Sequence, residues 1–122
     1  MRLPYVISNF SVRKSGCNFP KWLQDDWQNL HSRKNILEFK DQIHLKSTLS
    51  YCVQPSYQSA EKYLVYTQNQ CGYGYYNCIW IQKRSPNVLE LQFGRRPSTV
   101  PSFELCDSRN FWSKTWHTIA SK

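Results

Sequence analysis

The stretch IHLKSTLSYCVQ, residues 43–54, carries the clearest periodicity in the chain. Positions 43, 45, 49, 51 and 53 are aliphatic or aromatic, whereas positions 44, 46, 48, 50 and 54 are polar. This alternation, which Ser47 alone breaks, is typical of a β-strand with one buried and one solvated face. The pattern also predicts that Cys52 lies on the solvated face, where it can tie the strand to a covering loop.

Shorter segments of similar character surround this stretch. Residues 36–39 and 63–67 combine aliphatic and aromatic side chains and are predicted strands. Residues 79–82 and 88–93 flank a turn-like group at 83–87 that contains Pro86 and Asn87, so we expect them to form a hairpin. The sequence therefore predicts a mainly β fold, a small antiparallel barrel or sandwich with disulfides.

The length and charge of the chain limit its class. At 122 residues it makes about one domain. Its 16 Lys and Arg against 8 Asp and Glu give a formal charge of +8, which suits nucleic acid, acidic glycans or an anionic membrane surface without choosing among them. The basic residues are scattered, and their adjacent pairs include 33–34, 83–84 and 95–96. A solvated, mildly cationic surface is the simplest interpretation.

Five cysteines in so short a chain predict disulfide bonds. The nearest two have six residues between them, whereas structural zinc sites bring their ligands in closer pairs, so the sequence predicts no metal site. Five choices of an unpaired cysteine and three pairings of the other four allow 15 arrangements, which the sequence leaves open. The disulfide candidates are Cys17, Cys52, Cys71, Cys78 and Cys106.

Disulfides indicate an extracellular or luminal compartment. The amino-terminal residues make a poor signal peptide, because Pro4, Ser8 and Asn9 interrupt their apolar stretch and no small-residue cleavage site follows. No apolar run approaches the roughly 18 residues that span a bilayer, so the sequence predicts no transmembrane segment. We therefore expect a piece of a longer secreted or membrane-anchored protein, without its signal peptide. Asn9, in the sequon Asn9-Phe10-Ser11, is the candidate glycosylation site.

Three regions are expected along the chain. Residues 1–16 are an irregular leader, residues 17–106 the disulfide-containing β domain, and residues 107–122 a C-terminal tail or short helix. The segment 19–30 opens the domain with a helical turn that leads into a strand. Its two tryptophans, Trp22 and Trp27, are predicted to fill the core.

The segment QCGYGYYNC, residues 70–78, has two incompatible interpretations. Its centre, Gly-Tyr-Gly-Tyr, matches part of the RNP1 pattern of RNA-recognition domains, whereas its ends look like half-cystines that close a tight aromatic loop. The RNP2 partner and the helix between the two motifs are missing, which argues against RNA. We expect a glycine-dependent loop whose tyrosines pack on the sheet or present a binding surface. The candidate binding residues are Tyr73, Tyr75, Tyr76 and Trp80.

The sequence contains no recognisable catalytic motif. His31, His44 and His117 are far apart, and no nucleophile elbow, metalloprotease helix or phosphate loop is present. Asp25 and Asp26 are adjacent, but neighbouring side chains point in different directions on a helix or a strand. We therefore expect no enzymatic activity, no catalytic residue and no cofactor.

Several short motifs occur in an order that resembles a known group of domains. They are Cys17-x-Phe19-Pro20 with Trp22 and Trp27, Tyr51-Cys52, Asn77-Cys78-Ile79-Trp80-Ile81 and Ser85-Pro86-Asn87-Val88-Leu89-Glu90. Over about residues 17–106 the chain resembles extracellular domains of uncharacterised function that occur, often in tandem, in animal secreted and membrane-anchored proteins. The resemblance implies secretion, disulfide bonds and no known enzymatic activity. The opening also resembles the Gly-x-Trp opening of lipocalin barrels, with Trp27 in the Trp position and Asp25 in place of Gly.

These observations predict a non-enzymatic extracellular interaction or binding module whose partner is an unknown extracellular protein. One alternative is a lipocalin-like carrier of a small apolar ligand, with a cavity lined by the odd-numbered residues of 43–53. The second alternative is an RNA- or polyanion-binding protein with the three basic pairs on one face, although the sequence argues against nucleic acid.

Overall fold

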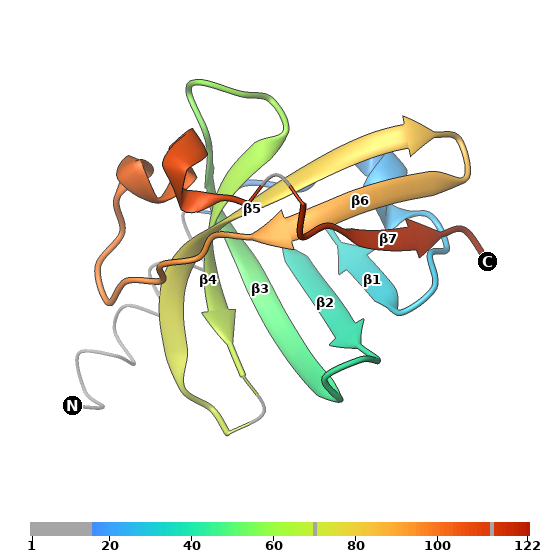
Figure 1. Ribbon diagram of the computed structural model, residues 1–122, viewed down its shortest axis with the longest axis horizontal. Helices are drawn as coiled ribbons and strands as arrows, with labels where there is room; N and C mark the ends of the chain where they lie inside the picture. The colour runs from blue at the N-terminus through green and yellow to red at the C-terminus, as the bar shows by residue number, and fades with distance from the viewer. Residues whose placement is uncertain (1–15, 70, 113) are drawn as a thin grey trace.

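The computed structural model describes residues 16–69, 71–112 and 114–122 (Figure 1). Over these residues one sheet contains seven strands, each antiparallel to the next in sequence order. The strands are β1 (Leu30–Arg33), β2 (Ile36–Asp41), β3 (Lys46–Pro55), β4 (Lys62–Gln68), β5 (Gly74–Ser85), β6 (Val88–Phe93) and β7 (His117–Ala120). Three short 3-10 helices accompany them: η1 (Lys21–Gln24), η2 (Phe103–Cys106) and η3 (Ser108–Asn110). The predicted mainly β, antiparallel fold is confirmed.

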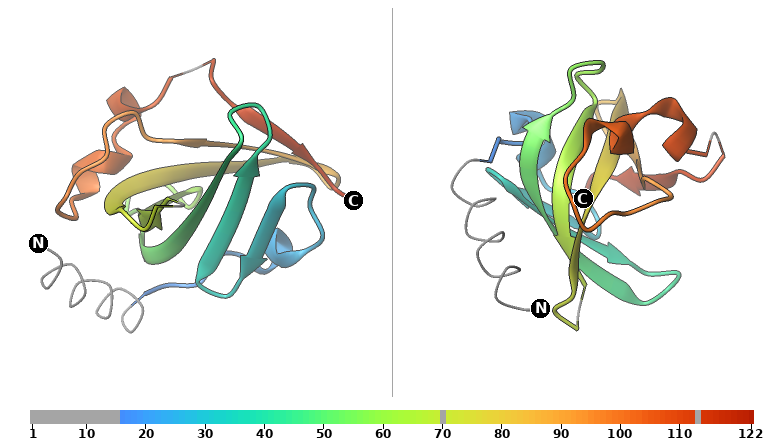
Figure 2. Two further views of the ribbon diagram at one scale, coloured as in Figure 1. Left: turned by 90° about the horizontal axis from the view of Figure 1, so that it is seen from below. Right: turned by 90° about the vertical axis from the view of Figure 1, so that its left-hand side faces the viewer.

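The sheet curls into a nearly closed barrel (Figure 2). Its two edges meet through the short segment 26–28, which precedes β1. Gln28 N donates to the Ala120 carbonyl at 2.9 Å, and Lys122 N donates to the Asp26 carbonyl at 3.0 Å. Trp27, between these bonds, forms bridges with both edges of the sheet. The closing segment therefore reaches the end of β7 and the beginning of β1 and leaves the rest of β7 uncovered.

Side chains fill the interior of the barrel. One cluster of buried apolar residues draws on η1 and on every strand, and its burial is the main favourable contribution to folding. Trp27 is 2% exposed, as its predicted role requires, whereas Trp22 is partly buried and packs against the cluster. The members of the interior cluster are Phe19, Leu23, Trp27, Leu30, Leu37, Phe39, Cys52, Tyr63, Val65, Ile79, Ile81, Leu89, Leu91 and Ile119.

An outer layer covers part of the other face of the sheet. The chain after β6 carries η2 and η3 across β4 and β5 (Figure 1). Its buried side chains form a second apolar cluster with residues of β3, β4 and β5. The members of this outer cluster are Tyr51, Leu64, Tyr66, Tyr76, Cys78, Leu105, Cys106 and Phe111. These three strands are consequently apolar on both faces.

The strand predicted to start at position 43 begins later, at Lys46. Asp41 Oδ1 accepts hydrogen bonds from the main-chain N–H groups of Ile43 at 3.0 Å and His44 at 3.2 Å, which closes a turn over residues 42–45. A side chain that bonds the nearby main chain in this way competes with a strand ladder. Ile43 and Leu45 consequently remain 80% and 81% exposed.

The prediction that Cys52 lies on a solvated face is wrong. Cys52 is fully buried in the interior cluster, whereas Tyr51 belongs to the outer cluster. Because both faces of β3 are covered, its alternation does not reveal which face is the inner one. The carrier alternative required the odd-numbered residues of 43–53 to line the interior of the barrel. They do not line it.

Two disulfides crosslink the barrel, as the cysteine count predicts. Cys17–Cys52 fastens the segment before η1 to β3, and Cys78–Cys106 fastens η2 to β5. Cys71 is unpaired and exposed in the β4–β5 connection. The possible bond between Cys71 and Cys78 does not form, because Cys78 is buried under η2 in the outer cluster.

The C-terminal residues complete the sheet, contrary to the predicted tail or short helix. After η3, residues 117–120 form β7, which pairs with β6 from Leu91↔His117 to Val88↔Ala120. Ile119 is the one buried residue of β7, so this strand has almost no alternating pattern to predict it from. Asn9 and all but the last residue of the predicted leader lie outside the described residues.

Thiol labelling tests the cysteine pairing. Without reductant, an alkylating reagent should label Cys71 alone, and peptide mapping should recover the 17–52 and 78–106 bonds. Each bond closes a loop long enough to contribute about 3–4 kcal/mol through the entropy of the unfolded chain. Reduction should therefore lower the melting temperature measured by circular dichroism. Labelling of all five cysteines without reductant would contradict the pairing.

Tyr63 should give the fold a dependence on alkaline pH. Its ring lies 5.4 Å from that of Phe19, and burial raises the pKa of its phenol. The phenol of the unfolded chain ionises near pH 10, so the stability that requires the neutral phenol is present below about pH 10 and is lost as pH rises through the folded pKa. We expect Tyr63→Phe to match the native chain in urea denaturation near pH 7 and to be the more stable protein near pH 11. Equal free energies of unfolding for Tyr63→Phe and the native chain at both pH values would show that the Tyr63 phenol does not cause the pH dependence.

Candidate functional site

A cleft lies between β7 and the turn that joins β2 to β3. Its volume is about 330 Å³. Residues 39–43 form one wall, residues 116–120 form the other, and the Gln28–Asn29 turn closes one end. Figure 2 shows the β2–β3 hairpin beside β7. The cleft therefore follows the part of the barrel wall that the closing segment does not seal.

The wall formed by β7 is an open strand edge. Ser121 N donates to the Asn87 carbonyl on the β6 side, whereas the Ala120 carbonyl accepts from Gln28 on the opposite side. Because consecutive residues of a strand direct their main-chain groups to opposite sides, Thr118 directs its N–H and C=O away from β6 and toward the cleft. Neither group has a hydrogen-bond partner among the described residues.

The opposite wall is a turn held by one carboxylate. Besides its two main-chain bonds, Asp41 accepts through Oδ2 from His44 Nδ1 at 2.8 Å. Burial alone would raise the pKa of Asp41, but the hydrogen bonds from His44 and Ile43 and the charge of His117 lower it. An ionised carboxylate accepts such bonds most strongly, so the turn has a fixed shape.

The inner side of the cleft is aromatic and aliphatic. The rings of Phe39 and His117, on opposite walls, lie 5.0 Å apart, and Ile119 is buried beside them. Ile43 stands at the outer rim on one wall and Thr118 on the other. This arrangement can contact an apolar side chain while it offers main-chain hydrogen bonds.

A smaller recess lies on the other side of the Gln28–Asn29 turn. It has a volume of about 260 Å³ and shares Lys40 with the cleft. His31 and Glu38 also line it. Its polar lining distinguishes this recess from the cleft.

The four predicted binding residues do not form one surface. Tyr73 is 71% exposed near the unpaired Cys71, whereas Tyr75 is partly buried and burial raises the pKa of its phenol. Tyr76 is buried against Tyr66, with ring centroids 5.0 Å apart. Because neighbouring residues of β5 point to opposite sides of the sheet, its adjacent tyrosines cannot share a face.

The two glycines of this segment serve different purposes. Gly72 has a φ of 88°, which side chains rarely allow. Gly74 leaves room for the phenol of Tyr66, which a Cβ would overlap. The turn and the packing account for both glycines without an RNA-binding role.

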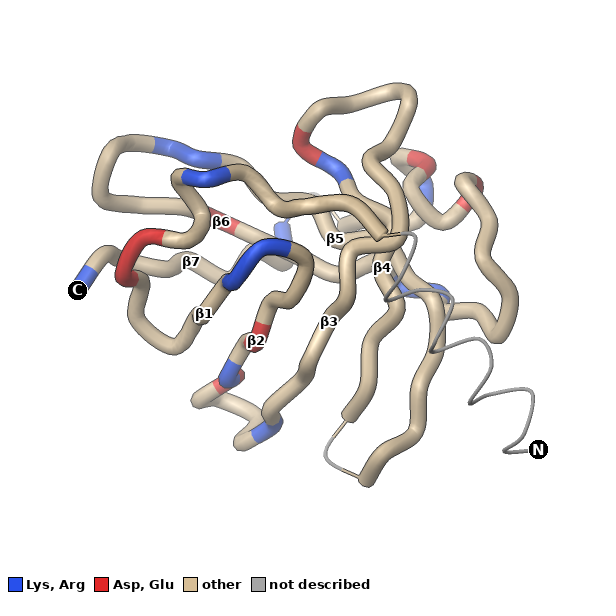
Figure 3. The backbone as a smooth tube through the Cα atoms, turned by 180° about the vertical axis from the view of Figure 1, so that it is seen from behind, with Lys and Arg blue, Asp and Glu red and all other residues tan. Residues whose placement is uncertain are grey.

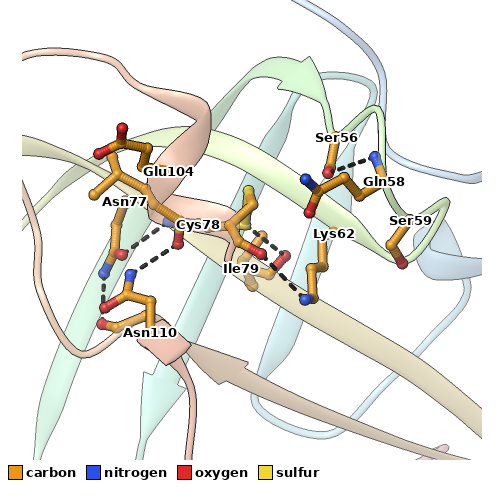
Figure 4. Close-up of a disulfide and its surroundings, with 12 residues drawn as sticks. Ser56, Gln58, Ser59, Lys62, Asn77, Cys78, Ile79, Glu104 and Asn110 are labelled. Atoms are coloured by element: carbon orange, nitrogen blue, oxygen red, sulfur yellow. Dashed lines mark hydrogen bonds between the residues drawn. A yellow bond between two sulfur atoms is a disulfide. The ribbon is translucent and has the colours of Figure 1, made fainter. Parts of the chain in front are cut away.

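Trp80, the fourth candidate, belongs to an aromatic cage. Its ring lies 5.3 Å from that of Phe111 and 4.9 Å from that of Trp116. Lys62 Nζ lies 4.5 Å from the Trp80 ring centroid and donates to the Cys106 carbonyl at 3.1 Å. In Figure 4 Lys62 points toward the neighbourhood of the Cys78–Cys106 disulfide. The chain thus fills this cage with its own cation.

Burial makes the position of Lys62 electrostatically unfavourable for its charged form. Burial lowers the pKa of its ammonium group, and the charges of Asp107 and Glu61 oppose that shift. Contact with two aromatic faces stabilises a desolvated cation. We conclude that Trp80 has a structural role, because it packs with Lys62 of β4 and Phe111 and so helps to fasten the outer layer to β4 and β5.

Trp112 is an exposed aromatic residue that the sequence did not single out. It is 53% exposed, and the guanidinium of Arg95 lies 4.2 Å from its ring centroid. The buried Gln92 side chain accepts from Trp112 N at 3.1 Å and donates to the Trp112 carbonyl at 2.8 Å. No sequence pattern links these residues, because the long connection after β6 brings them together.

The basic residues are distributed over several elements (Figure 3). The pair 33–34 lies at the β1–β2 turn, 83–84 lies in β5, and 95–96 follows β6. Some of these charges have partners: Arg84 bonds to Glu90 at 2.6 Å, and Lys83 lies 5.2 Å from the Trp22 ring centroid. Within residues 16–69, 71–112 and 114–122, this distribution gives the polyanion alternative no concentrated site.

Two of the three histidines, His44 and His117, interact with the Asp41 carboxylate, whereas His31 lies elsewhere. His31 lies by the smaller recess, His44 pairs with Asp41, and His117 faces Phe39. Across the part of the chain that the structure describes, no three His, Cys, Asp or Glu side chains are grouped so as to hold a metal ion.

Comparison with known proteins gives a family. Over residues 13–118 the chain matches the model of a domain of unknown function, DUF7043. The chain belongs to this family. No curated protein and no solved structure matches it. The predicted membership of an uncharacterised domain family is confirmed.

The DUF7043 match extends beyond the last disulfide-bonded cysteine, Cys106. It reaches Thr118 and thus includes the whole outer layer and the start of β7. Within the described ranges of this DUF7043 domain, no helix has the length and apolar character needed to cross a membrane.

Substitution of Lys62 tests the role of the cage in the DUF7043 domain. Lys62→Ala removes the packing of a buried side chain and should lower the free energy of unfolding by about 2 kcal/mol. Lys62→Met keeps most of that packing and removes the desolvated charge, so its stability should stay close to that of the native chain. Urea denaturation followed by Trp fluorescence measures both. Equal losses in the two variants would assign the effect to the charge.

Proposed function

We propose that this domain is an extracellular, non-enzymatic binding module that recognises another protein through the cleft between β7 and the β2–β3 turn. Two disulfides support an oxidising compartment.

The composition of the cleft carries this proposal. Phe39 and Ile119 offer apolar contact on its inner side, and Thr118 offers at its rim a main-chain donor and acceptor that have no partner among the described residues. Unpaired strand edges are a hazard that proteins usually cover. An apolar recess beside such an edge suits a partner that supplies both a side chain and main-chain hydrogen bonds.

The exposed side chains of the β2–β3 turn support the same conclusion. Leu45 has a φ of 54°, in the left-handed region, which costs a bulky residue about 1 kcal/mol or more. Gly or Asn would relieve that strain. Leu45 therefore weakens the turn, and both Ile43 and Leu45 leave apolar surface in water, so a contribution to binding explains these side chains better than stability does.

The filled interior bears on the carrier alternative. Interior positions of all seven strands are occupied by packed apolar side chains over the described residues. Recognition at the surface therefore accounts for the arrangement better than enclosure of a small apolar molecule.

Paired charge substitutions test the proposed function. The probe is the fluorescently labelled, disulfide-intact domain, applied to intact cells of the source organism and measured by flow cytometry. Native protein should bind saturably, and Ile43→Lys, at the rim of the cleft, should weaken binding about tenfold or more by placing a charge against the partner's apolar contact. Val100→Lys is the matched control, since Val100 is 60% exposed and lies outside the cleft.

The control variant should bind like the native protein, and both variants should keep the native melting temperature. Absence of saturable binding, or equal binding by Ile43→Lys and native protein, would count against a binding role for the cleft.

A further inference from the structure

We infer that β7 accepts a short extended segment of a partner protein as an additional strand, so that the cleft is a strand-addition site. This inference rests on the proposed function and deepens it by specifying the form of the partner. An extended peptide that joins a sheet edge gains affinity from main-chain hydrogen bonds and specificity from pockets for alternate side chains.

On the side away from β6, the main chain of β7 already forms strand-like hydrogen bonds. The closing segment forms antiparallel hydrogen bonds with residues 120 and 122 on the face away from β6. Beyond that contact the chain turns away at Gln28–Asn29, and Thr118 N–H and C=O continue the same row without a partner among the described residues. An added strand would extend the row that the protein itself begins.

The length of the open edge limits the segment. β7 contains four residues, and Gln28 occupies the carbonyl of its last residue, Ala120. At about 3.3 Å per residue, the edge from His117 to Ile119 offers roughly 10 Å. The paired part of the partner is therefore only about three residues long.

The neighbouring side chains specify its pattern. Residues of an added strand alternate between the inner and the outer side of the sheet. The residues of an added strand that lie opposite His117 and Ile119 point inward, toward Phe39 and Ile119, whereas the residue between them lies opposite the exposed Thr118 and faces solvent. The partner segment should therefore carry apolar side chains on both sides of one position of freer choice.

Apart from its short length, the edge of β7 lacks the usual devices against unwanted pairing. Proteins protect edge strands with Lys, Pro, bulges or inward charges. β7 reads His-Thr-Ile-Ala and contains no Lys or Pro, and its pairing with β6 is regular. At the other edge of the sheet, β1 begins against Trp27 and ends at a charged residue, Arg33.

Two substitutions at one position test strand addition. Thr118→Pro removes the cleft-facing N–H without removing a ladder bond to β6, so the fold should tolerate it. Thr118→Ala keeps that N–H and removes the hydroxyl, which donates to Glu90 at 3.3 Å, and is the matched control. The probe is a phage-displayed library of random peptides, selected on the native disulfide-intact domain and then synthesised.

We expect the selected peptides to share apolar residues on both sides of one position, to lose at least about tenfold in affinity for Thr118→Pro and to bind Thr118→Ala like the native domain. Hydrogen exchange at the Thr118 amide should slow when peptide binds. Both variants should keep the native far-ultraviolet circular dichroism.

The opposite results would overturn the inference. Recovery of no binding peptide, equal affinity of both variants, or unchanged exchange at Thr118 would each exclude strand addition. A concentration-dependent dimer that Thr118→Pro abolishes would assign the edge to a second copy of this chain instead. Loss of cell binding in Ile43→Lys with full binding by Thr118→Pro would retain the proposed function and reject strand addition alone.

Discussion

Closure of the sheet is the constraint on which the rest of the structure depends. A curled antiparallel sheet has two edges whose main-chain groups need partners or water. Here the segment 26–28 lies between the edges and bonds to the start of β1 and the end of β7. Trp27 holds this segment in place, because its side chain is 2% exposed in the interior cluster and its Nε1 donates to the Trp22 carbonyl at 3.3 Å. Hydrophobic burial thus positions the main-chain bonds that close the barrel.

The irregular outer layer depends on side-chain amides as well as on a disulfide. Asn77 Nδ2 donates to the Gly94 carbonyl at 2.9 Å, and Asn110 Nδ2 donates to the Leu105 carbonyl at 2.8 Å (Figure 4 shows both amides). A connection with little regular structure cannot satisfy its own buried polar groups, so side chains of the sheet and of the layer itself must do so. Together with Cys78–Cys106, these bonds keep the layer on β4 and β5 and leave β7 out of its reach.

The sequence predicted most of the strands, because alternation and turn residues are local signals. It could not orient β3, since Tyr51 and Cys52 are both buried but in different clusters. It also could not find the cleft, whose walls come from residues 28–29, 39–43 and 116–120, which only the closed barrel brings together. The tyrosine-rich segment attracted attention for its composition, yet the twofold period of β5 sends Tyr75 and Tyr76 to opposite faces. Composition indicated a binding surface, and topology decided where one could form.

The closing segment and the cleft are two results of the same turn. Asn29 has a φ of 62°, a conformation that Asn tolerates better than most residues, and its carbonyl accepts from Lys40 N at 2.9 Å. A longer closing segment would continue along β7 and satisfy Thr118, which would stabilise the barrel and remove its open edge. The turn at Gln28–Asn29 prevents this. Because β7 is paired with β6 and its inner face packs against a filled core, an incoming segment would meet an edge that is already ordered, and little of the free energy of binding would be needed to order the domain.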